Sequence, residues 1–536
     1  MEFAPAPFPR DLQAGYRAAG LHTDALIGDL MRRNAIEFGS RTAVIQGSHE
    51  LTWAELVEAS LRFAGFLQAQ GIGSGDVVVW QLPNWWESMV VAFGIWASGA
   101  ISVPVVPIYR GHELTAIVEA VGPKCVITAA SFRSTDHVAQ FESVLAATGH
   151  DPVRIVVRGA APGWMGFEDA VTATPAARVA VDPDAPTLVG FTSGTTSGAK
   201  GAVMSTRAVL TVPMRHARVV PYTFRDRSYM PAPVSHVTGL LMAVTLPLVS
   251  GCSIVLAERW DAAQAVDDFI RHGVTFSGGA AVFIQELVEA IGAAGLSSFP
   301  LSCGYNCGGS AIPVDLVRRA EELGMKPRRA YGMTECPTVS ASYGYDPVEI
   351  RLETDGRLLP GIELRVLDEA GRDVAPGGVG EFLVRGPQRA LGYLDPQHTR
   401  DAFDDDGWFR TGDLGAIDGR GCLTVTGRTK DIINRGGEKL SAREIEELIC
   451  RHPGVGDAAV VAAPHPRLGE EPAAFIIRRP GDATTDEELQ AFLRAEGVAP
   501  QKVPRIWVPV DEFPRTPSGK VKKYDLVERL PPRSVR

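Results

Sequence analysis

Through its first 180 residues the chain alternates short runs of Val and Ile with longer stretches whose apolar residues recur at helical spacing. Residues 52–71 have the pattern of an amphipathic helix that starts after an N-capping Thr52 and ends at Gly71. The segments DVVVWQL, ISVPVV and KCVITAA have the length and composition of buried strands. This alternation, which returns after residue 250, predicts parallel sheets with helices on their faces.

Two later regions have different patterns. Residues 364–386 alternate apolar and polar positions around the turn sequences DEAG and PGG, which predicts a small β unit. After GRTKD, residues 427–431, the pattern indicates a separate α+β region. Its first helix starts at SAREIEE, where Ser441 and Glu444 predict a capping box.

The most apolar stretch, residues 88–108, has no charged side chain and about the length that spans a bilayer. Pro83 favours a helix start just before it, Gly99 favours a helix end within it, and Pro104 and Pro107 interrupt its last residues. The stretch therefore predicts a buried helix of about fifteen residues followed by a buried strand, and no membrane span.

The composition is that of a globular protein, since 45% of the 536 residues are hydrophobic and 22% are charged. With 53 basic and 63 acidic side chains the net charge is −10, which argues against a nucleic-acid partner, because such a partner needs a basic surface. The start of the chain lacks a basic segment followed by an apolar core, so we expect no secretory signal and a cytoplasmic protein. Seven cysteines without a CxxC pair are expected to be reduced and to hold no zinc.

A polar loop, TSGTTSGAKG at residues 192–201, interrupts the apolar pattern. Gly194 and Gly198 permit backbone conformations that point successive N–H groups inward, the hydroxyl side chains add donors, and Lys200 adds a positive charge. These features predict a cradle for polyphosphate, although a run of Ser, Thr and Gly by itself is more often a surface loop. The loop is not a Walker A motif, because the residues on either side of the lysine do not match GxxxxGK[ST].

Four further motifs follow in order: YGMTEC at 331–336, GWFRTGDLG at 407–415, GRTKDIINRGGEK at 427–439 and PRTPSGK at 514–520. Together with the loop, their order and spacing resemble the adenylate-forming superfamily of acyl-CoA synthetases, carrier-protein adenylation domains and luciferases. The resemblance implies an α/β fold whose large N-terminal domain, residues 1–429, has two doubly wound αβ subdomains plus a small β-barrel unit. A small, mobile α+β C-terminal domain, residues 430–536, would follow a hinge near Lys430.

The same resemblance implies that these motifs bind ATP. Tyr331 would stack on the base, Thr334 would donate a hydrogen bond to the α-phosphate, and Glu335 would hold Mg²⁺ through a carboxylate oxygen. Asp413 would accept hydrogen bonds from both ribose hydroxyls, with Arg428 beside the ribose. The other nucleotide-binding residues would be Thr192, Ser193, Gly194, Thr195, Thr196 and Lys200 at the phosphates, and Gly308, Gly309, Ser310 and Gly332 at the adenine.

The reaction implied by the superfamily overcomes the poor reactivity of a carboxylate. Attack of the carboxylate on the α-phosphate of ATP gives an acyl-adenylate and pyrophosphate, and AMP is then a good leaving group. Lys520 resembles the lysine that bridges the two anions in this step. In the second step the C-terminal domain rotates, Lys520 withdraws, and Gly436 and Gly437 approach a tunnel through which a pantetheine thiol enters beside His236.

The acceptor is expected to be coenzyme A, because the chain ends soon after Lys520 and leaves no room for a carrier module; a free-standing carrier protein is the alternative. Small side chains suggest an acyl pocket with volume for a bulky alicyclic, aromatic or medium-chain acid, and no carboxylate or asparagine stands out there to bind an amino group. The residues of this expected pocket are His236, Gly278, Gly279, Cys303, Gly308 and Cys336. Homodimers are common in similar enzymes, and the sequence leaves monomer and homodimer open.

The loop departs from the superfamily pattern TSGTTGxPKG, because Ser197 replaces a glycine and Ala199 replaces the proline. If Gly198 has not taken over the missing glycine's role, the first step is weakened, and an enzyme specialised for thioesterification is one alternative. A pseudoenzyme that binds nucleotide without turnover, and a kinase or ATPase that releases ADP, are two others. Each motif residue also has an ordinary structural explanation by itself, and it is their combination that favours the synthetase.

Overall fold

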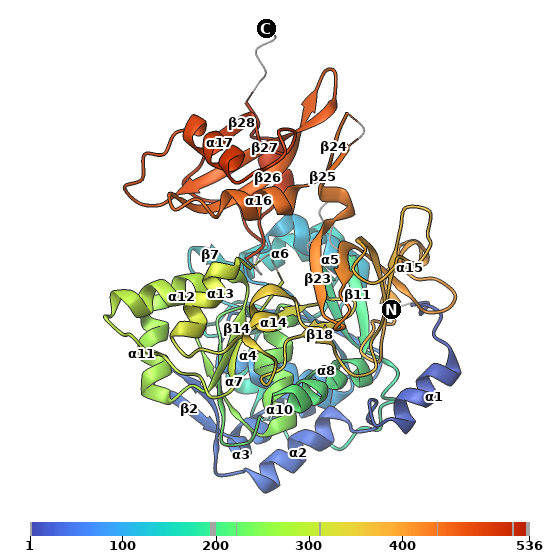
Figure 1. Ribbon diagram of the computed structural model, residues 1–536. Helices are drawn as coiled ribbons and strands as arrows, with labels where there is room; N and C mark the ends of the chain where they lie inside the picture. The colour runs from blue at the N-terminus through green and yellow to red at the C-terminus, as the bar shows by residue number, and fades with distance from the viewer. Residues whose placement is uncertain are drawn as a thin grey trace.

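The computed structural model describes residues 3–192, 200–220, 222–309, 312–436, 438–516 and 519–531. Two large sheets with helices form the lower part of the molecule in Figure 1, and the C-terminal unit lies above them. The prediction of a mixed α/β fold is confirmed. All seven cysteines are free thiols.

The first large sheet has the strand order β21-β11-β10-β4-β3-β5-β8-β9. Val78 and Trp80 pack on one face with α3 and α4, whereas Val77 and Val79 pack on the other with α5 and α6, as expected for a strand that is buried on both sides. Its elements are β3 (Val77–Gln81), β4 (Ile101–Pro104), β5 (Cys125–Ala129), β8 (Val153–Val157), β9 (Met165–Gly166), β10 (Pro186–Thr192), β11 (Lys200–Ser205), β21 (Gly392–Tyr393), α3 (Trp53–Ala69), α4 (Trp86–Ser98), α5 (Gly111–Val121) and α6 (His137–Thr148).

The second large sheet has the order β18-β17-β16-β15-β14-β12-β13-β1-β2, so β1 and β2 from the start of the chain lie at its edge. Helices α11, α12 and α13 bury one face of this sheet. Its elements are β1 (Thr42–Gln46), β2 (His49–Thr52), β12 (Arg227–Met230), β13 (Ser253–Leu256), β14 (Phe276–Gly279), β15 (Gly304–Gly308), β16 (Pro327–Tyr331), β17 (Ser340–Ala341), β18 (Arg357–Leu358), α11 (Ala262–His272), α12 (Ala281–Ala293) and α13 (Val314–Glu322).

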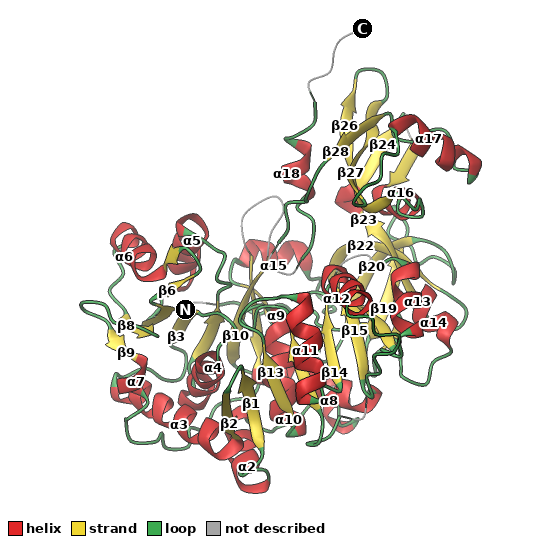
Figure 2. Cartoon of the chain, turned by 90° about the vertical axis from the view of Figure 1, so that its left-hand side faces the viewer, coloured by secondary structure: helices red, strands yellow, loops and turns green. Residues whose placement is uncertain are grey.

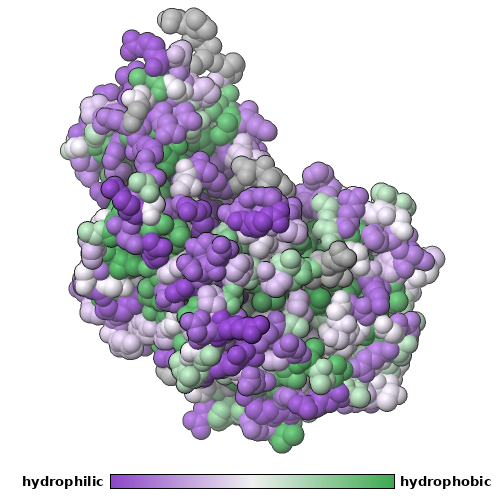
Figure 3. All heavy atoms as spheres, turned by 90° about the vertical axis from the view of Figure 1, so that its right-hand side faces the viewer, coloured by the Kyte–Doolittle hydropathy of each residue, from purple (hydrophilic) through white to green (hydrophobic). Residues whose placement is uncertain are grey.

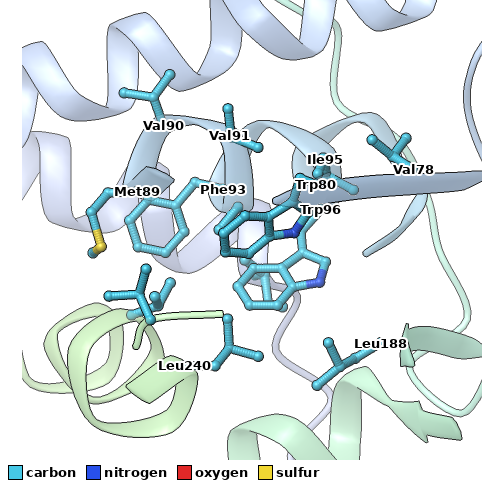
Figure 4. Close-up of a cluster of buried hydrophobic side chains, with 14 of the residues drawn as sticks. Val78, Trp80, Met89, Val90, Val91, Phe93, Ile95, Trp96, Leu188 and Leu240 are labelled. Carbon is cyan, nitrogen blue, oxygen red and sulfur yellow. The ribbon is translucent and has the colours of Figure 1, made fainter. Parts of the chain in front are cut away.

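Helix α8 (Thr206–Val219) connects the two sheets. It contacts β10 and β11 of the first sheet and also η1 (Leu240–Thr245), a π-helical segment that contacts β12 of the second. Figure 4 shows Leu188 of β10 and Leu240 of η1 facing Trp80, Phe93 and Trp96 in the main core. The helix therefore has a fixed place between the sheets.

The small β unit predicted at residues 364–386 is part of a four-stranded antiparallel sheet with the order β19-β20-β22-β23. The C-terminal unit is a second small sheet flanked by helices, and Figure 2 shows it projecting from the rest of the molecule. The elements of these two units are β19 (Glu363–Leu367), β20 (Gly380–Arg385), β22 (Phe409–Ile417), β23 (Leu423–Arg428), β24 (Ile432–Arg435), β25 (Glu438–Ser441), β26 (Val455–His465), β27 (Gly469–Arg478), β28 (Ile506–Pro509), α16 (Ala442–Ile449), α17 (Asp486–Ala495) and α18 (Lys523–Val527).

Short elements complete the chain. In a space-filling view the C-terminal unit forms a smaller lobe on the larger part, and hydrophilic side chains cover much of this face (Figure 3). The remaining elements are α1 (Arg10–Ala18), α2 (Ile27–Glu37), β6 (Ser131–Phe132), β7 (Thr135–Asp136), α7 (Phe167–Ala170), α9 (Val237–Gly239), α10 (Leu246–Ser250), α14 (Val348–Glu353), α15 (Pro396–Ala402) and η2 (Thr429–Asp431).

The first predicted helix is confirmed in detail. Thr52 Oγ1 accepts a hydrogen bond from the Glu55 backbone N–H (3.3 Å), and the Glu55 carboxylate accepts one from the Thr52 N–H (2.9 Å). Gly71, just beyond the helix, has φ +72°, a value that glycine adopts without a Cβ clash. The predicted end of the helix is therefore also correct.

The apolar run at residues 88–108 forms most of helix α4, which begins at Trp86, and then strand β4, as predicted. The helix has 13 residues and ends at Gly99, whose φ of 87° is left-handed. Within the described parts of the chain, no helix is long and apolar enough to cross a membrane.

The capping box predicted at the start of α16 is only half formed. Ser441 Oγ accepts a hydrogen bond from the Glu444 N–H (3.2 Å), but the Glu444 carboxylate pairs with Lys502 Nζ (2.5 Å). The prediction of a reciprocal bond is wrong, because a lysine offers the carboxylate a charged partner instead of the Ser441 N–H.

Candidate active site

A large cleft lies where the C-terminal unit meets the carboxyl ends of β14, β15 and β16. Parallel strands end at the same edge of a sheet, so residues distant in sequence meet there. The small sheet contributes the wall formed by β22 and β23. The cleft brings together these predicted residues: Thr192, Lys200, His236, Gly278, Gly279, Gly308, Gly309, Tyr331, Gly332, Thr334, Glu335, Asp413, Arg428, Lys430 and Lys520.

Other predicted site residues have different places. Gly436 is in the turn between β24 and β25, with φ +61°, and does not line the cleft. The predicted residues Ser193, Gly194, Thr195, Thr196, Ser310 and Gly437 lie outside the described residues, as do Ser197, Gly198 and Ala199. At the two ends of the phosphate loop, Thr192 and Lys200 pair across β10 and β11, and Thr192 Oγ1 donates to the Lys200 carbonyl (3.3 Å).

Two strands of the small sheet hold a carboxylate at the cleft wall. Asp413 on β22 is paired in register with Arg428 on β23, and Arg428 Nε lies 2.6 Å from Asp413 Oδ1. Tyr331, at the end of β16, donates its hydroxyl to Asp413 Oδ2 (2.7 Å). Burial raises the pKa of Tyr331 well above its ordinary value, and the Asp413 carboxylate adds to this shift, so the hydroxyl stays a donor. A carboxylate can accept about four hydrogen bonds, so Asp413 retains capacity for a ligand.

A second carboxylate, Glu335, also lines the cleft and is 9% exposed. The Tyr393 hydroxyl donates to Glu335 Oε1, and Lys200 Nζ lies 5.6 Å from the centroid of the Tyr393 ring. Burial and the adjacent Glu335 raise the pKa of Tyr393 far above its ordinary range. Tyr393 thereby connects Lys200 with Glu335. The sequence did not predict a role for Tyr393, because only the pairing of β21 with β11 places it there.

Lys520 reaches the cleft from a tight hairpin of the C-terminal unit. The Thr516 N–H donates to the Lys520 carbonyl (2.7 Å), and the Gly519 N–H donates to the Thr516 carbonyl (2.9 Å). A Cβ atom built on Gly309 would lie 3.7 Å from Lys520 Cε, so the lysine stem runs along the end of β15. Burial lowers the pKa of Lys520, as does the Arg428 guanidinium, while Asp413 and Glu335 favour the charged form. Lys520 thus lines the same cleft as both carboxylates, Asp413 and Glu335, and is within their electrostatic influence.

His236 lies opposite, as the N-cap of α9. Its Nδ1 accepts a hydrogen bond from the Thr238 N–H (3.3 Å). Burial lowers the pKa of His236 to about 4, with Lys520 acting in the same direction, so the ring is neutral near pH 7. A smaller pocket behind it is lined by Tyr109, Gly190, Ser235 and Thr334.

Three expectations for the acyl pocket are wrong. Cys303 and Cys336 do not line the cleft: the Cys303 thiol contacts Asp226 Oδ1 (3.2 Å), and Cys336 is fully buried. In addition, an asparagine does reach the cleft, since Asn306 lines it together with His216 of α8. The sequence did not predict His216 as a site residue, because α8 precedes the pocket strands by many residues and only its place between the sheets brings it close.

The described side chains include no group of three or more His, Cys, Asp or Glu that could hold a metal ion by themselves. Glu335, the residue predicted to hold Mg²⁺, lines the cleft, and its Oε1 already accepts a hydrogen bond from the Tyr393 hydroxyl. This donor set fits Mg²⁺, which is commonly held by one or two carboxylates together with substrate phosphates and water, and not by a cage of protein ligands.

Comparison with known proteins agrees with this geometry. The family described as "AMP-binding enzyme" matches residues 31–394, and "AMP-binding enzyme C-terminal domain" matches residues 444–520. The medium-chain fatty-acid–CoA ligase of Escherichia coli (strain K12) is 32% identical over 98% of this chain and 94% of its own length. The 3-[(3aS,4S,7aS)-7a-methyl-1,5-dioxo-octahydro-1H-inden-4-yl]propanoyl:CoA ligase of Rhodococcus jostii (strain RHA1) is 33% identical over 93% of this chain and 97% of its own length.

Among solved structures, the ATP-bound MatB from Rhodopseudomonas palustris has a TM-score of 0.84 at 26% identity, over 94% of this chain and 98% of that one. Since 94% of this chain is covered, the similarity spans both the large part and the C-terminal unit. The motifs, the two family matches and the full-length relatives lead to one conclusion: this chain belongs to the adenylate-forming superfamily of AMP-binding enzymes.

Proposed function

We propose that the protein is an AMP-forming acid–thiol ligase that converts a bulky carboxylic acid, ATP and coenzyme A into acyl-CoA, AMP and pyrophosphate. The observation that carries the proposal is the position of Lys520, which enters the cleft beside Gly309 and shares it with Asp413 and Glu335. A single cation at this point can bridge two anions, the acid's carboxylate and the α-phosphate, that would otherwise repel each other.

In the first step the nucleotide would lie along β15 and β16. Asp413, fixed by Arg428 and Tyr331, would accept the ribose hydroxyls, and the close backbone at Gly308 and Gly309 would follow the adenine. Tyr331 presents a ring beside this path, although its hydroxyl is engaged by Asp413. Thr192, Lys200 and Gly332 would complete the nucleotide site, together with the phosphate-loop residues.

At the reacting phosphate, Thr334 would donate a hydrogen bond and Glu335 would hold Mg²⁺. The Tyr393 hydroxyl fixes one carboxylate oxygen of Glu335, which orients the other for the ion. When bound, Mg²⁺ would supply neutralising positive charge for the phosphates. Lys520 would hold the attacking carboxylate against the α-phosphate, and pyrophosphate would leave.

For the second step we propose that the chain divides into domains at residues 1–429 and 430–536 and rotates about Lys430. This residue lies in the short η2 segment directly after β23, where few residues connect the two parts. Rotation would withdraw Lys520 and open the smaller pocket behind Thr334 and His236 to a pantetheine thiol. Gly436 and Gly437 would approach the arm of the thiol, and the neutral His236 ring would lie beside the acyl carbon.

The acid would occupy the part of the cleft between His236 and β14. Gly278 and Gly279 line this part of the cleft, and a Cβ atom on either would come within 3 Å of a neighbour, the Asn306 carbonyl (2.9 Å) or Phe283 Cδ2 (2.7 Å). The two curated relatives, whose names specify a medium-chain fatty acid and a ring-bearing propanoyl group, support an apolar acid of substantial size. We therefore propose a bulky alicyclic, aromatic or medium-chain acid as substrate.

A panel of such acids tests this proposal. The purified protein is incubated with ATP, Mg²⁺ and each acid, with coenzyme A, with pantetheine, or without thiol, and mass spectrometry follows the products. We expect AMP and acyl-CoA from at least one acid, and acyl-adenylate when the thiol is omitted. Release of ADP, or no thioester from either ATP and acid or a synthetic acyl-adenylate, would contradict the proposal.

One arm of the panel addresses the altered phosphate loop. If no acid yields acyl-adenylate but synthetic acyl-adenylate and coenzyme A give thioester, the enzyme is specialised for the second step. Ser197 and Ala199, which depart from the superfamily pattern, are the observation that favours this second candidate.

A further inference from the structure

Three polar side chains are connected in a line at the inner end of the cleft. Arg328 Nε donates to Asn306 Oδ1 (3.0 Å), and Asn306 Nδ2 lies 3.4 Å from His216 Nδ1. Arg328 is 3% exposed and His216 is 4% exposed, whereas Asn306 is half-buried. His216 and Asn306 line the cleft, and Arg328 lies behind them. We call these three residues the Arg328 relay.

The direction of the hydrogen bonds in the Arg328 relay follows from its arginine. A guanidinium can only donate, so the Asn306 oxygen must face Arg328 and the Asn306 amide nitrogen must face His216. That nitrogen is also only a donor, so His216 Nδ1 must be an unprotonated acceptor. The proton of the neutral ring is then on Nε2.

Other properties of His216 agree with this tautomer. Burial, together with the nearby Arg328 and Arg215 guanidinium groups, lowers the pKa of His216 to about 4, so the ring is neutral near pH 7. Nε2 makes no hydrogen bond with any described residue, and His216 lines the cleft. The Arg328 relay therefore presents an N–H donor to the cleft, while Asn306 Oδ1 already accepts a hydrogen bond from Arg328.

The Arg328 relay lies far from the reacting end of the cleft. Asn306 is three residues before Gly309 on β15, and Lys520 passes Gly309. Three residues of an extended strand span about 10 Å. An acid whose carboxylate meets Lys520 would thus bring its opposite end to the Arg328 relay.

We propose that the Arg328 relay selects acids that carry a neutral oxygen acceptor, such as a ring ketone or ether, at the end opposite the carboxyl group, through the N–H of His216. The inference rests on the proposed function and names its substrate class. An ammonium group would meet a hydrogen-bond donor, the His216 N–H, at this position. A second carboxylate would be buried against the neutral His216 and Asn306 side chains, with Arg328 held behind Asn306, and this is unfavourable without direct ion pairing.

Binding of stable acyl-adenylate analogues tests the inference without requiring turnover. The probes are the sulfamoyl-adenosine conjugates of 3-(4-oxocyclohexyl)propanoic acid, 3-cyclohexylpropanoic acid and 3-(4-carboxycyclohexyl)propanoic acid, each measured by calorimetry. We expect the oxo conjugate to bind about tenfold or more tightly than the cyclohexyl conjugate, because the latter leaves the His216 N–H unpaired. The carboxy conjugate should be the weakest of the three.

Two variants separate selection from structural support. His216→Phe removes the donor and should abolish the preference for the oxo conjugate, while it retains binding of the cyclohexyl conjugate. His216→Gln places an amide N–H near the position of Nε2 and should keep most of the preference. Circular dichroism and the urea midpoint of each variant identify any loss of folding. If His216→Phe does not fold, the test is the ratio of the affinities for the oxo and cyclohexyl conjugates, compared between His216→Gln and the wild type.

The outcomes also separate this inference from the proposed function. Equal binding of the oxo and cyclohexyl conjugates, or tighter binding of the carboxy conjugate, would overturn the inference and leave the ligase proposal intact. Failure of all three conjugates to bind would overturn both, since the adenosine part is common to them.

Discussion

Replacement of Lys520 by alanine is expected to lower the rate of acyl-adenylate formation by about 10²–10³-fold, equivalent to about 3–4 kcal/mol of transition-state stabilisation. The ammonium group is the cation that the C-terminal unit brings to Asp413 and Glu335, and it would hold the attacking carboxylate against the α-phosphate. Thioester formation from supplied acyl-adenylate should change by only a few-fold, because Lys520 withdraws in that step. Single-turnover assays of the two half-reactions measure the difference.

The anchoring of the Lys520 hairpin makes this result specific. Arg515 pairs with Asp457 (2.6 Å) and Lys523 pairs with Glu446 (2.7 Å), so ion pairs fix the hairpin to the C-terminal unit on both sides of Lys520. Lys502→Ala is the control, since Lys502 is another lysine of this unit, pairs with Glu444 and does not line the cleft. Equal loss in both half-reactions for Lys520→Ala, or no loss, would refute the bridging role.

The second large effect is expected for Glu335→Gln, which should slow the ATP-dependent step by about 10²-fold or more and raise the Mg²⁺ concentration needed for half-maximal rate. The substitution keeps the shape of the side chain and its bond to Tyr393 but removes the charge that would hold the ion. Pyrophosphate–ATP exchange, measured over a range of Mg²⁺ concentrations, gives both quantities.

Tyr393→Phe is the control for this prediction. It removes the hydroxyl that donates to Glu335 Oε1 but leaves the carboxylate charge, so we expect a loss of less than about tenfold. If the two variants had equal effects and neither changed the Mg²⁺ requirement, Glu335 would be only a structural partner of Tyr393.

Much of this fold follows from local sequence signals. The helix capped by Thr52 and the buried helix α4 end where glycine and capping residues predict, because these signals act within one or two turns. The motif residues Tyr331 and Asp413, which the superfamily resemblance assigned to one nucleotide site, lie together, with a direct hydrogen bond between them.

Contacts between elements that are distant in the sequence could not be predicted from the sequence. Tyr393 reaches Glu335 only through the pairing of β21 with β11, and His216 reaches the cleft only because α8 lies between the sheets. The small side chains of Cys303 and Cys336 fitted an open pocket, but Cys303 contacts Asp226, Cys336 is buried, and neither lines the cleft. At the start of α16, the Glu444 carboxylate pairs with Lys502 instead of accepting the predicted hydrogen bond from the Ser441 N–H.

The most direct test of the proposed chemistry follows the oxygen atoms of the acid. An accepted acid is labelled with ¹⁸O in its carboxylate and converted with ATP, Mg²⁺ and coenzyme A in unlabelled water, and the AMP is analysed by mass spectrometry. Attack of the carboxylate on the α-phosphate transfers one labelled oxygen to each AMP, and this is the result we predict. Unlabelled AMP, or label in orthophosphate with ADP as the nucleotide product, would contradict formation of an acyl-adenylate in this cleft.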